Sequence, residues 1–367
     1  MAAELLQSPP QPRQTGLDAS PSRLFPVKAG GPSSPTANLK SSATTELFPT
    51  TVPSRGRPVQ TADGQAPPPP EPVKAEITPG WIMASIPYGL MHLACLGVFW
   101  TGISWDAVLV CLASYVIRMF GVTAVYHRYF SHRTFRTSRF FQFLLALLAT
   151  SSAQLGPLWW AATHRHHHAT SDTEIDPHSP RHHGFWWSHM GWFLHPDNRQ
   201  ENLKAIRDYA RFPELVFIDR WSLLSPTLLA IATFALGWGL QQAGRPTSGM
   251  QMLVWGFFVS TVLLYHGTYT INSLSHVFGS QRFNTGDDSR NNFFLALITL
   301  GEGWHNNHHH CQSSCRQGIY WWEIDITYLA LALMARLGLV WDLRPVPQSV
   351  YQEASRVRSL ARRTGPG

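Results

Sequence analysis

Four long apolar stretches divide this chain, and polar, histidine-rich regions separate them. The apolar stretches are residues 81–102, 107–126, 222–241 and 250–271. Each has about the 20 residues that an α-helix needs to cross the apolar core of a bilayer. Only the short linkers ISWD and QAGRPTSG join the members of each pair. The pattern predicts an all-α integral membrane protein with four transmembrane helices arranged as two hairpins.

One charged residue interrupts a predicted span, and two further apolar runs are too short or too charged to be spans. Arg118 interrupts the second stretch, and we expect it to face protein or water, because a charge facing lipid is costly. The run 140–149 is too short for a span, so we predict a helix that lies in the membrane interface or packs under the polar regions. The run 319–341 contains Glu323, Asp325 and Arg336, which favours one or two amphipathic helices over a fifth span.

The distribution of positive charge predicts which way the hairpins face. Residues 127–221 contain 11 Lys or Arg, whereas the two hairpin linkers contain only Arg245. Because positive loops stay on the cytoplasmic side, we expect the histidine-rich regions and both termini there. The membrane is either a bacterial inner membrane or the endoplasmic reticulum. The net charge of +7 is then a membrane signal, and we expect no nucleic-acid partner.

Composition separates one membrane domain from its two ends. Of the 27 prolines, 16 lie in residues 1–80, and none of the 18 histidines does. We therefore predict a disordered Pro/Ser-rich tail over 1–78, a membrane domain with a helical cap over 79–344, and a basic C-terminal tail over 345–367. The N-terminus lacks the pattern of a signal peptide. Cys95, Cys111, Cys311 and Cys315 are expected to be reduced.

Three histidine clusters lie on the predicted cytoplasmic side. They are HRYFSH, with His127 and His132, HRHHH, with His164, His167 and His168, and HNNHH, with His305, His308 and His309. In the last two, positions i, i+3 and i+4 share one helix face, so their imidazoles can converge. The i, i+5 spacing of the first is less regular on an ideal helix, and we expect a distorted turn there, where the second span leaves the membrane. His166 and His310 point off the ligand face, and Asn306 and Asn307 are interpreted as spacers.

Eight convergent imidazoles exceed the needs of one metal ion, so the clusters predict two ions. Neutral imidazole suits iron, zinc, copper and nickel, and each ligand needs an acceptor for its second ring nitrogen. Four carboxylates are candidates for that role: Asp172, Glu174, Asp176 and Glu302. Because no hydrolytic motif accompanies the clusters, a redox metal acting with oxygen on a lipid chain is favoured over zinc. Ligand type alone leaves copper open.

The clusters and their flanks resemble the membrane fatty acyl desaturases of the stearoyl-CoA (delta-9) type, especially bacterial acyl-CoA desaturases. The resemblance covers about Trp81 to Arg344. The motifs that carry it are GVTAVYHRYFSHRTF, GPLWWAATHRHHHATSDTEIDPHSP, GFWWSHMGWFL, NSLSHVFG and GEGWHNNHHHCQSS. It implies a cytosolic cap with two Fe ions, a ninth histidine ligand, His276, and a contact of Asn272 through water. No catalytic residue beyond the metal ligands is implied.

The same resemblance implies the reaction and the residues that hold the substrate. A diiron oxidant formed with O₂ would remove two hydrogens from a C16–C18 acyl chain at the delta-9 position, leaving a cis double bond. Gln154, Trp160 and Thr268 match the kink of the substrate tunnel, and Tyr115 and Met119 match its closed end. Five basic residues could receive a phosphorylated headgroup such as that of CoA: Arg165, Arg181, Arg199, Lys204 and Arg207. The carrier is acyl-CoA or, alternatively, an acyl-lipid.

The sequence alone leaves two alternative functions possible and does not choose among three electron donors. A diiron lipid hydroxylase would use the same oxidant, and a histidine-rich metal transporter would bind metal without chemistry. The chain has no haem-binding or flavin-binding segment, so electrons are expected from cytochrome b5, ferredoxin or rubredoxin.

Overall fold

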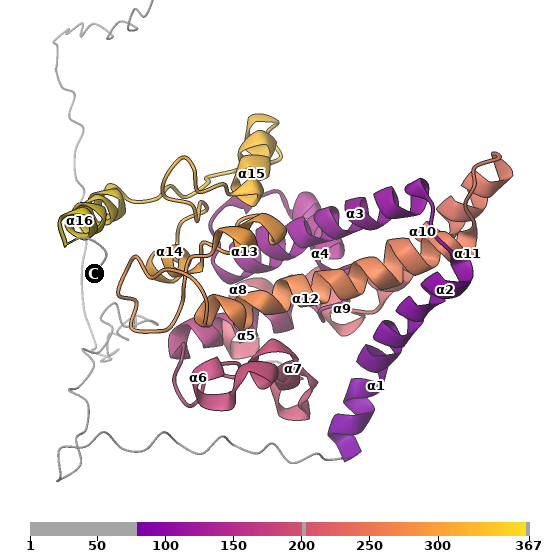
Figure 1. Ribbon diagram of the computed structural model, residues 1–367, viewed down its shortest axis with the longest axis horizontal. Coiled ribbons are helices and arrows are strands. Elements are labelled where there is room, and N and C mark those ends of the chain that lie inside the picture. Colours follow the sequence, from indigo (N-terminus) through magenta and orange to yellow (C-terminus); the bar gives the residue numbers. More distant parts are fainter. Residues whose placement is uncertain (1–78, 200–202, 365–367) are drawn as a thin grey trace, which may run out of the picture. The chain divides into compact units, whose positions relative to one another are not determined.

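A computed structural model describes residues 79–199 and 203–364, and the predicted tail 1–78 lies outside these ranges. The described chain is mostly helical, and its one small sheet pairs β1 (Arg136–Thr137) with β2 (Val340–Trp341) in antiparallel register. Figure 1 shows long helices on one side and a group of shorter helices on the other. This arrangement agrees with the predicted all-α class.

Four helical segments are long and apolar enough to cross a membrane, as predicted. The first, Pro79–Thr101, contains α1 (Pro79–Ala94), η1 (Cys95–Gly97) and α2 (Val98–Thr101). The second, Trp105–Ser131, contains α3 (Trp105–Phe120) and η2 (Gly121–Ser131). The third is α10 (Leu224–Gln242). The fourth, Gly249–His276, contains α11 (Gly249–Leu253), η6 (Val254–Val259), α12 (Ser260–Asn272) and η7 (Leu274–His276).

The two short linkers lie together at one end of the four segments. Ser104 accepts a hydrogen bond from the backbone N–H of Ala107 and so caps α3, and Ser248 caps α11 through Gln251 in the same way. Arg245 of one linker region donates to both carboxylate oxygens of Asp106, at 2.6 and 3.1 Å. The linkers are therefore held side by side, at the end of the bundle away from the histidines.

Arg118 faces protein, as its position in a span predicts. Its side chain is 2% exposed, and it donates to Thr261 Oγ1 at 2.7 Å and to Ser260 Oγ at 2.6 Å. The charge thus ties α3 to α12 inside the bundle, where its hydrogen bonds offset the cost of burial.

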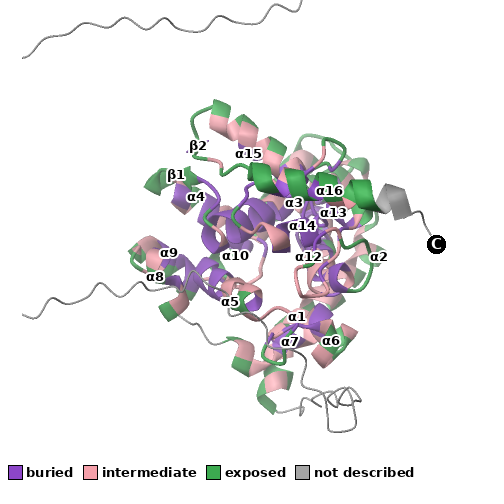
Figure 2. Ribbon diagram, turned by 90° about the vertical axis from the view of Figure 1, so that its left-hand side faces the viewer, coloured by how far each residue is buried: buried purple, intermediate pink, exposed green. Residues whose placement is uncertain are grey.

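The shorter helices form a cap around the histidines. Between the second and third spans they are α4 (Arg139–Thr150), α5 (Pro157–Thr170), α6 (Pro180–His183), η3 (Trp187–Gly191), α7 (Trp192–Leu194), η4 (Pro196–Arg199), η5 (Leu203–Ile206), α8 (Arg207–Ala210) and α9 (Pro213–Arg220). After the fourth they are α13 (Phe293–Ile298), α14 (His305–His310), α15 (Ile326–Arg336) and α16 (Gln348–Thr364). Buried residues gather at the centre of the cap, whereas α15 and α16 are partly exposed (Figure 2).

The two shorter apolar runs form helices with one buried and one exposed face. In α4, Leu145 and Ala149 are buried and Phe140 is 72% exposed. In α15, Leu331 is buried while Leu329 and Leu333 are exposed. The run 319–341 therefore forms one amphipathic helix followed by β2.

Residues beyond Arg344 contact the cap. Val346, Val350 and Ala354 are buried in one cluster with Phe283 and Ile319. The helix α16 therefore covers the loops that surround α14.

Candidate metal centre

A π-helix brings the first two histidines onto one face. The segment η2 is a π-helix, and the backbone N–H of His132 donates to the carbonyl of His127, five residues earlier, at 3.2 Å. An i→i+5 ladder brings residues five apart closer to one face than an α-helix does. This is the distorted turn expected at HRYFSH.

The helix α5 is fixed at its N-terminus by a carboxylate from another helix. Asp219 of α9 accepts from the backbone N–H of Leu158 at 2.7 Å and of Trp159 at 3.1 Å. A Cβ at Gly156 would lie 2.1 Å from Asp219 Oδ1, so the approach needs glycine. Pro157 occupies the first turn, where its missing N–H costs nothing. These contacts set the position of the three histidines that α5 carries.

The helix α14 is fixed by its two asparagines. Asn306 Oδ1 accepts from the backbone N–H groups of Arg282 and Phe283, both at 2.8 Å. Asn307 accepts from Asn291 Nδ2 at 2.9 Å and donates to the Gln317 carbonyl at 3.0 Å. Both are buried. These residues do more than space the ligands, because their amides join α14 to the surrounding loops.

Five histidines form the first group, which we call the five-histidine group: His127, His132, His164, His168 and His308. Their Nε2 atoms converge. The distances are 2.9 Å from His127 to His308, and 3.0 Å from His132 to His164, from His164 to His168 and from His168 to His308.

Four histidines form the second group, the four-histidine group: His167, His276, His305 and His309. The Nε2 atoms of His276 and His305 lie 3.1 Å apart. His276 comes from η7, at the end of the fourth span, and all four residues are buried. The structure thus brings together all nine histidines singled out from the sequence.

Both groups fit metal ions. Two imidazole nitrogens about 2.1 Å from one ion are about 3.0 Å apart when they meet it at right angles. The Nε2 separations of 2.9–3.1 Å match that spacing. His309 Nε2 is buried and has no hydrogen-bond partner among the described residues, so a lone pair points into the four-histidine group.

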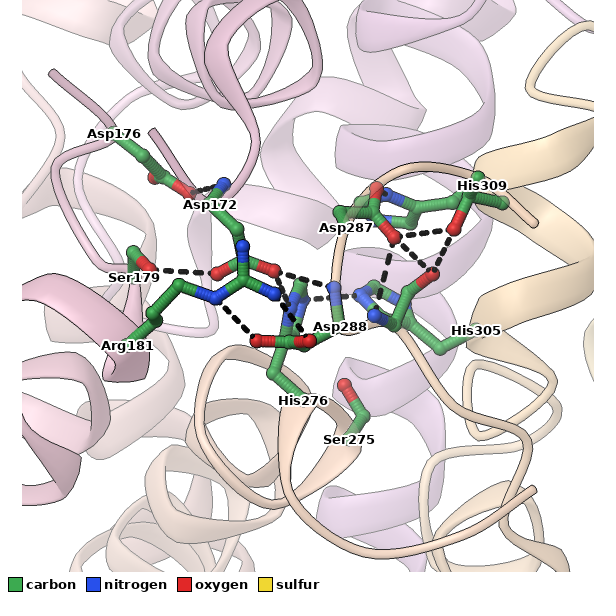
Figure 3. A network of polar contacts seen from close by, with 12 residues as sticks. Asp172, Asp176, Ser179, Arg181, Ser275, His276, Asp287, Asp288, His305 and His309 are labelled. Atoms are coloured by element: carbon green, nitrogen blue, oxygen red, sulfur yellow. Dashed lines mark hydrogen bonds and ion pairs between the residues drawn. The ribbon is translucent and has the colours of Figure 1, made fainter. Parts of the chain in front are cut away.

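Four carboxylates accept hydrogen bonds from imidazole Nδ1–H groups. The distances from a carboxylate oxygen to Nδ1 are 2.6 Å for Glu302 and His127, 3.1 Å for Asp176 and His167, 2.9 Å for Asp172 and His276, and 2.7 Å for Asp287 and His309. Figure 3 shows Asp172 and Asp287 reaching the four-histidine group from different segments. Such bonds leave Nε2 as the free ligand atom and fix the ring.

Three of these carboxylates are predicted from the sequence, whereas Asp287 is not. It lies 22 residues before His309, outside every histidine cluster, so spacing gave no signal. Glu174 is exposed and has no hydrogen bond to an imidazole among the described residues. The loop that carries Glu174 turns it outward, while Asp172 and Asp176 on either side are buried.

Burial keeps most of the imidazoles neutral. Desolvation and neighbouring histidines hold the pKa of five of them well below the ordinary value: His132, His164, His168, His305 and His308. Burial also lowers the pKa of His309 to about 4, against the opposing effect of Asp287. Neutral imidazole is the form that binds metal.

The carboxylates are held ionised despite their burial. Burial alone would raise the pKa of Asp172, but its hydrogen bond and charge interaction with His276 lower it below the ordinary range. In the same way, interaction with His167 lowers the pKa of Asp176 against the effect of its burial. Interaction with His309 does so for the pKa of Asp287. These charges in turn raise the pKa of His167 against the effect of its burial.

A cavity of about 590 Å³ adjoins the five-histidine group. Its lining includes His164, Asn272 and the three predicted kink residues Gln154, Trp160 and Thr268. Gln154 Nε2 donates to Thr268 Oγ1 at 3.0 Å, and the Trp160 ring stacks on His164 at 5.0 Å between centroids. Tyr115 and Met119 are not among the residues that line it. Tyr115 instead donates to the Ile298 carbonyl, and Met119 is fully buried beside Leu264.

The five predicted headgroup cations are placed differently from one another. Arg165 makes a two-pronged ion pair with Asp208, and Arg181 makes one with Asp288. Arg199 lines the cavity. Lys204 and Arg207 are exposed and are not part of the cavity lining.

Four apolar helical segments, two groups of converging histidines that could hold metal and an adjoining cavity are features of a membrane metalloprotein. The chain matches the fatty acid desaturase family over residues 103–342, and it belongs to that family. It is therefore an oxidoreductase of lipid metabolism.

Named relatives match nearly three quarters of the chain. The chain is 37% identical over 273 residues to an acyl-CoA 5-desaturase of Anemone leveillei, covering 72% of this chain and 79% of the relative. It is 36% identical over 267 residues to an sn-1 stearoyl-lipid 9-desaturase of Anabaena variabilis, covering 72% and 93%. An sn-1 stearoyl-lipid 9-desaturase of Synechocystis is 35% identical over 278 residues, covering 75% and 84%.

Proposed function

We propose that the protein catalyses O₂-dependent desaturation of a saturated fatty acyl chain and leaves a cis double bond. The observation that carries the proposal is the convergence of nine imidazoles in two groups beside an apolar cavity. The family and the relatives' names support desaturation. From the resemblance we propose a chain of C16–C18 and a double bond at the delta-9 position. The relatives' names include both acyl-CoA and acyl-lipid desaturases.

We propose two iron ions, one held by the five-histidine group and one by the four-histidine group. Asn272, which lines the cavity, would contact one of the irons through water. When bound, the irons supply the redox chemistry by which O₂ is used to break C–H bonds. One hydrogen from each of two adjacent methylenes, two external electrons and two protons reduce O₂ to two waters.

The protein's own residues would position the chain and protect the site. Gln154 and Thr268, joined by their hydrogen bond, and Trp160 form the part of the cavity wall next to His164. A chain bent there presents one pair of methylenes to the metal site, and positioning decides which C–H bond reacts. Glu302, Asp172, Asp176 and Asp287 keep the imidazoles oriented and compensate positive charge in the buried site.

The partners follow from the same proposal. Electrons come from an external donor, which is cytochrome b5, ferredoxin or rubredoxin. The active site and both termini lie on the cytoplasmic side, supported by the basic region 127–221 and by the pairing of the linkers at the opposite end. The two pairs of spans are then hairpins that both open toward the cap.

Expression in a host that lacks its own desaturase tests the function. Gas chromatography with mass spectrometry of fatty acid methyl esters is expected to show chains lighter by two hydrogens. A gain of one oxygen would instead identify a lipid hydroxylase. Saturated chains only, from protein with two bound irons and a working donor, would contradict both.

A further inference from the structure

The cavity is open on the side that faces lipid. Three of its lining residues are exposed within or directly beside the membrane-crossing helices: Pro87 in α1, Thr227 in the first turn of α10, and Leu223, which directly precedes α10. Leu223 is 75% exposed. Apolar lining residues that remain uncovered mark an opening between α1 and α10, which a bilayer would surround.

The helix α1 is attached along one side only. Tyr88 stacks on Tyr265 at 5.9 Å between ring centroids and meets Phe193 at 5.8 Å. The Nε2 atoms of His92 and His266 lie 3.2 Å apart. These contacts join α1 to α12 and to the cap. No described residue of α1 is buried, so its other side leaves the cavity accessible from the membrane.

One cation stands at this opening. The guanidinium of Arg199 donates to the carbonyls of Phe193, at 3.1 Å, and of Ala84 in α1, at 3.2 Å. It forms no ion pair with a carboxylate among residues 79–199 and 203–364, and its side chain is exposed. Its remaining N–H groups can therefore meet an anion at the end of the cavity nearest the cap.

The other cations do not complete a CoA site at the cavity. CoA carries several phosphate groups, which calls for a cluster of cations. The guanidinium groups of Arg165 and Arg181 are already paired with Asp208 and Asp288. Within residues 79–199 and 203–364, Arg199 is the one Lys or Arg in the cavity lining. A single cation matches a single phosphodiester better than it matches CoA.

We propose that the substrate is the acyl chain of a phospholipid, which enters sideways from the bilayer between α1 and α10 while Arg199 binds the lipid phosphate. The proposal rests on the desaturase function proposed above and selects the acyl-lipid over the acyl-CoA carrier. The chain would pass Leu223 and Thr227 before it reaches Trp160 and His164. The glycerol backbone would remain at the membrane surface.

Nanodiscs separate the two carriers. Purified, iron-loaded protein with a chemical or protein reductant is placed in bilayers of methyl-branched diphytanoyl lipid. One sample contains distearoylphosphatidylglycerol and the other stearoyl-CoA. We expect a double bond in the glycerolipid and slower conversion of stearoyl-CoA. Equal or faster conversion of stearoyl-CoA would overturn the proposal. Conversion of neither substrate would instead count against the desaturase function.

A substitution at the opening tests the route. Leu223→Trp is expected to slow phospholipid desaturation at least about fivefold by filling the opening, whereas Leu236→Trp, an exposed leucine of α10 outside the cavity, keeps the wild-type rate. Thr227→Trp serves as a second change at the opening if Leu223→Trp does not fold. An unchanged rate in folded, iron-loaded variants at both positions would overturn the lateral route.

Arg199→Gln tests the headgroup contact. We expect about a tenfold rise in the apparent KM for distearoylphosphatidylglycerol with little change in kcat, because a charge-assisted contact is lost. The KM for an uncharged distearoyl galactolipid should stay the same. Arg211→Gln, an exposed cap arginine outside the cavity, is the control. Equal effects on both lipids would show that Arg199 only braces α1 and would contradict its role in binding phosphate.

Discussion

His308 and His309 are adjacent in α14, yet their rings point into different histidine groups. Their centroids are 5.7 Å apart and the ring planes stand at 85° to each other. Consecutive residues of an α-helix are rotated by about 100°, which separates i+3 from i+4. The same division occurs on α5, where His168 joins the five-histidine group and His167 the four-histidine group. Each helix therefore serves both proposed metal sites.

This division predicts that neighbouring histidines control different ions. We expect His308→Ala and His309→Ala each to retain about one iron per chain, lost from different sites. Iron analysis combined with Mössbauer spectroscopy distinguishes the two remaining ions. Identical spectra from the two variants would contradict the assignment of these residues to separate sites.

Glu302 is expected to act on metal through His127. It also accepts from Arg128 Nη1 and from Gln317 Nε2, both at 2.7 Å, so its carboxylate is held by three partners. Glu302→Gln keeps the shape of the side chain and should lower the affinity for iron by about 10–100-fold. We expect His308→Ala, which removes a ligand, to lower it further. Iron titration of both proteins measures the difference. An equal loss of iron would mean that Glu302 itself binds metal.

Asp287 offers a test with a matched neighbour. Asp287→Asn removes the charged acceptor of His309 Nδ1–H and should weaken iron binding about 10–100-fold. Asp288→Asn is the control, because the Asp288 carboxylate pairs with Arg181 and not with an imidazole. Equal changes of iron affinity in both variants would contradict a role of Asp287 in supporting His309.

The buried imidazoles make the metal-free protein sensitive to acid. The pKa of His309 is about 4 in the folded chain, whereas an unfolded histidine titrates near 6.5. Between these values the unfolded chain binds more protons, so stability falls as pH falls through that range. The other histidines with lowered pKa act in the same direction, and His167, whose pKa is raised, opposes them.

Thermal unfolding of the iron-free protein measures this dependence. We expect a lower Tm at pH 5 than at pH 7, with a smaller loss in His309→Phe. A Tm that is the same or higher at pH 5 would contradict the predicted loss of stability in acid.

Gly303 permits the close approach that positions α14. A Cβ there would lie 2.0 Å from the Ala296 backbone nitrogen, so Gly303→Ala should destabilise the protein by about 1–3 kcal/mol and reduce iron loading. Gly239→Ala is the control, since a Cβ at that position of α10 meets nothing within 4 Å. Differential scanning fluorimetry compares the two, and equal melting temperatures would contradict the prediction.

The spans and the histidine clusters could be predicted because both are local patterns. Twenty apolar residues indicate a span without knowledge of its neighbours, and i, i+3, i+4 spacing indicates a shared helix face. The assignment of His167 and His168 to different groups could not be predicted, because it depends on which segments surround α5. Asp287 and the opening between α1 and α10 depend in the same way on segments far apart in the sequence.

The central claim is that two irons held by the histidine groups remove two hydrogens from an acyl chain. The most direct test measures iron content and product mass on the same purified sample of wild-type protein, supplied with O₂ and an electron donor. We predict two irons per chain and a product lighter by two hydrogens, with His308→Ala losing one iron and the product together. Full desaturation by protein that contains zinc only, or by His308→Ala with one iron, would contradict the account.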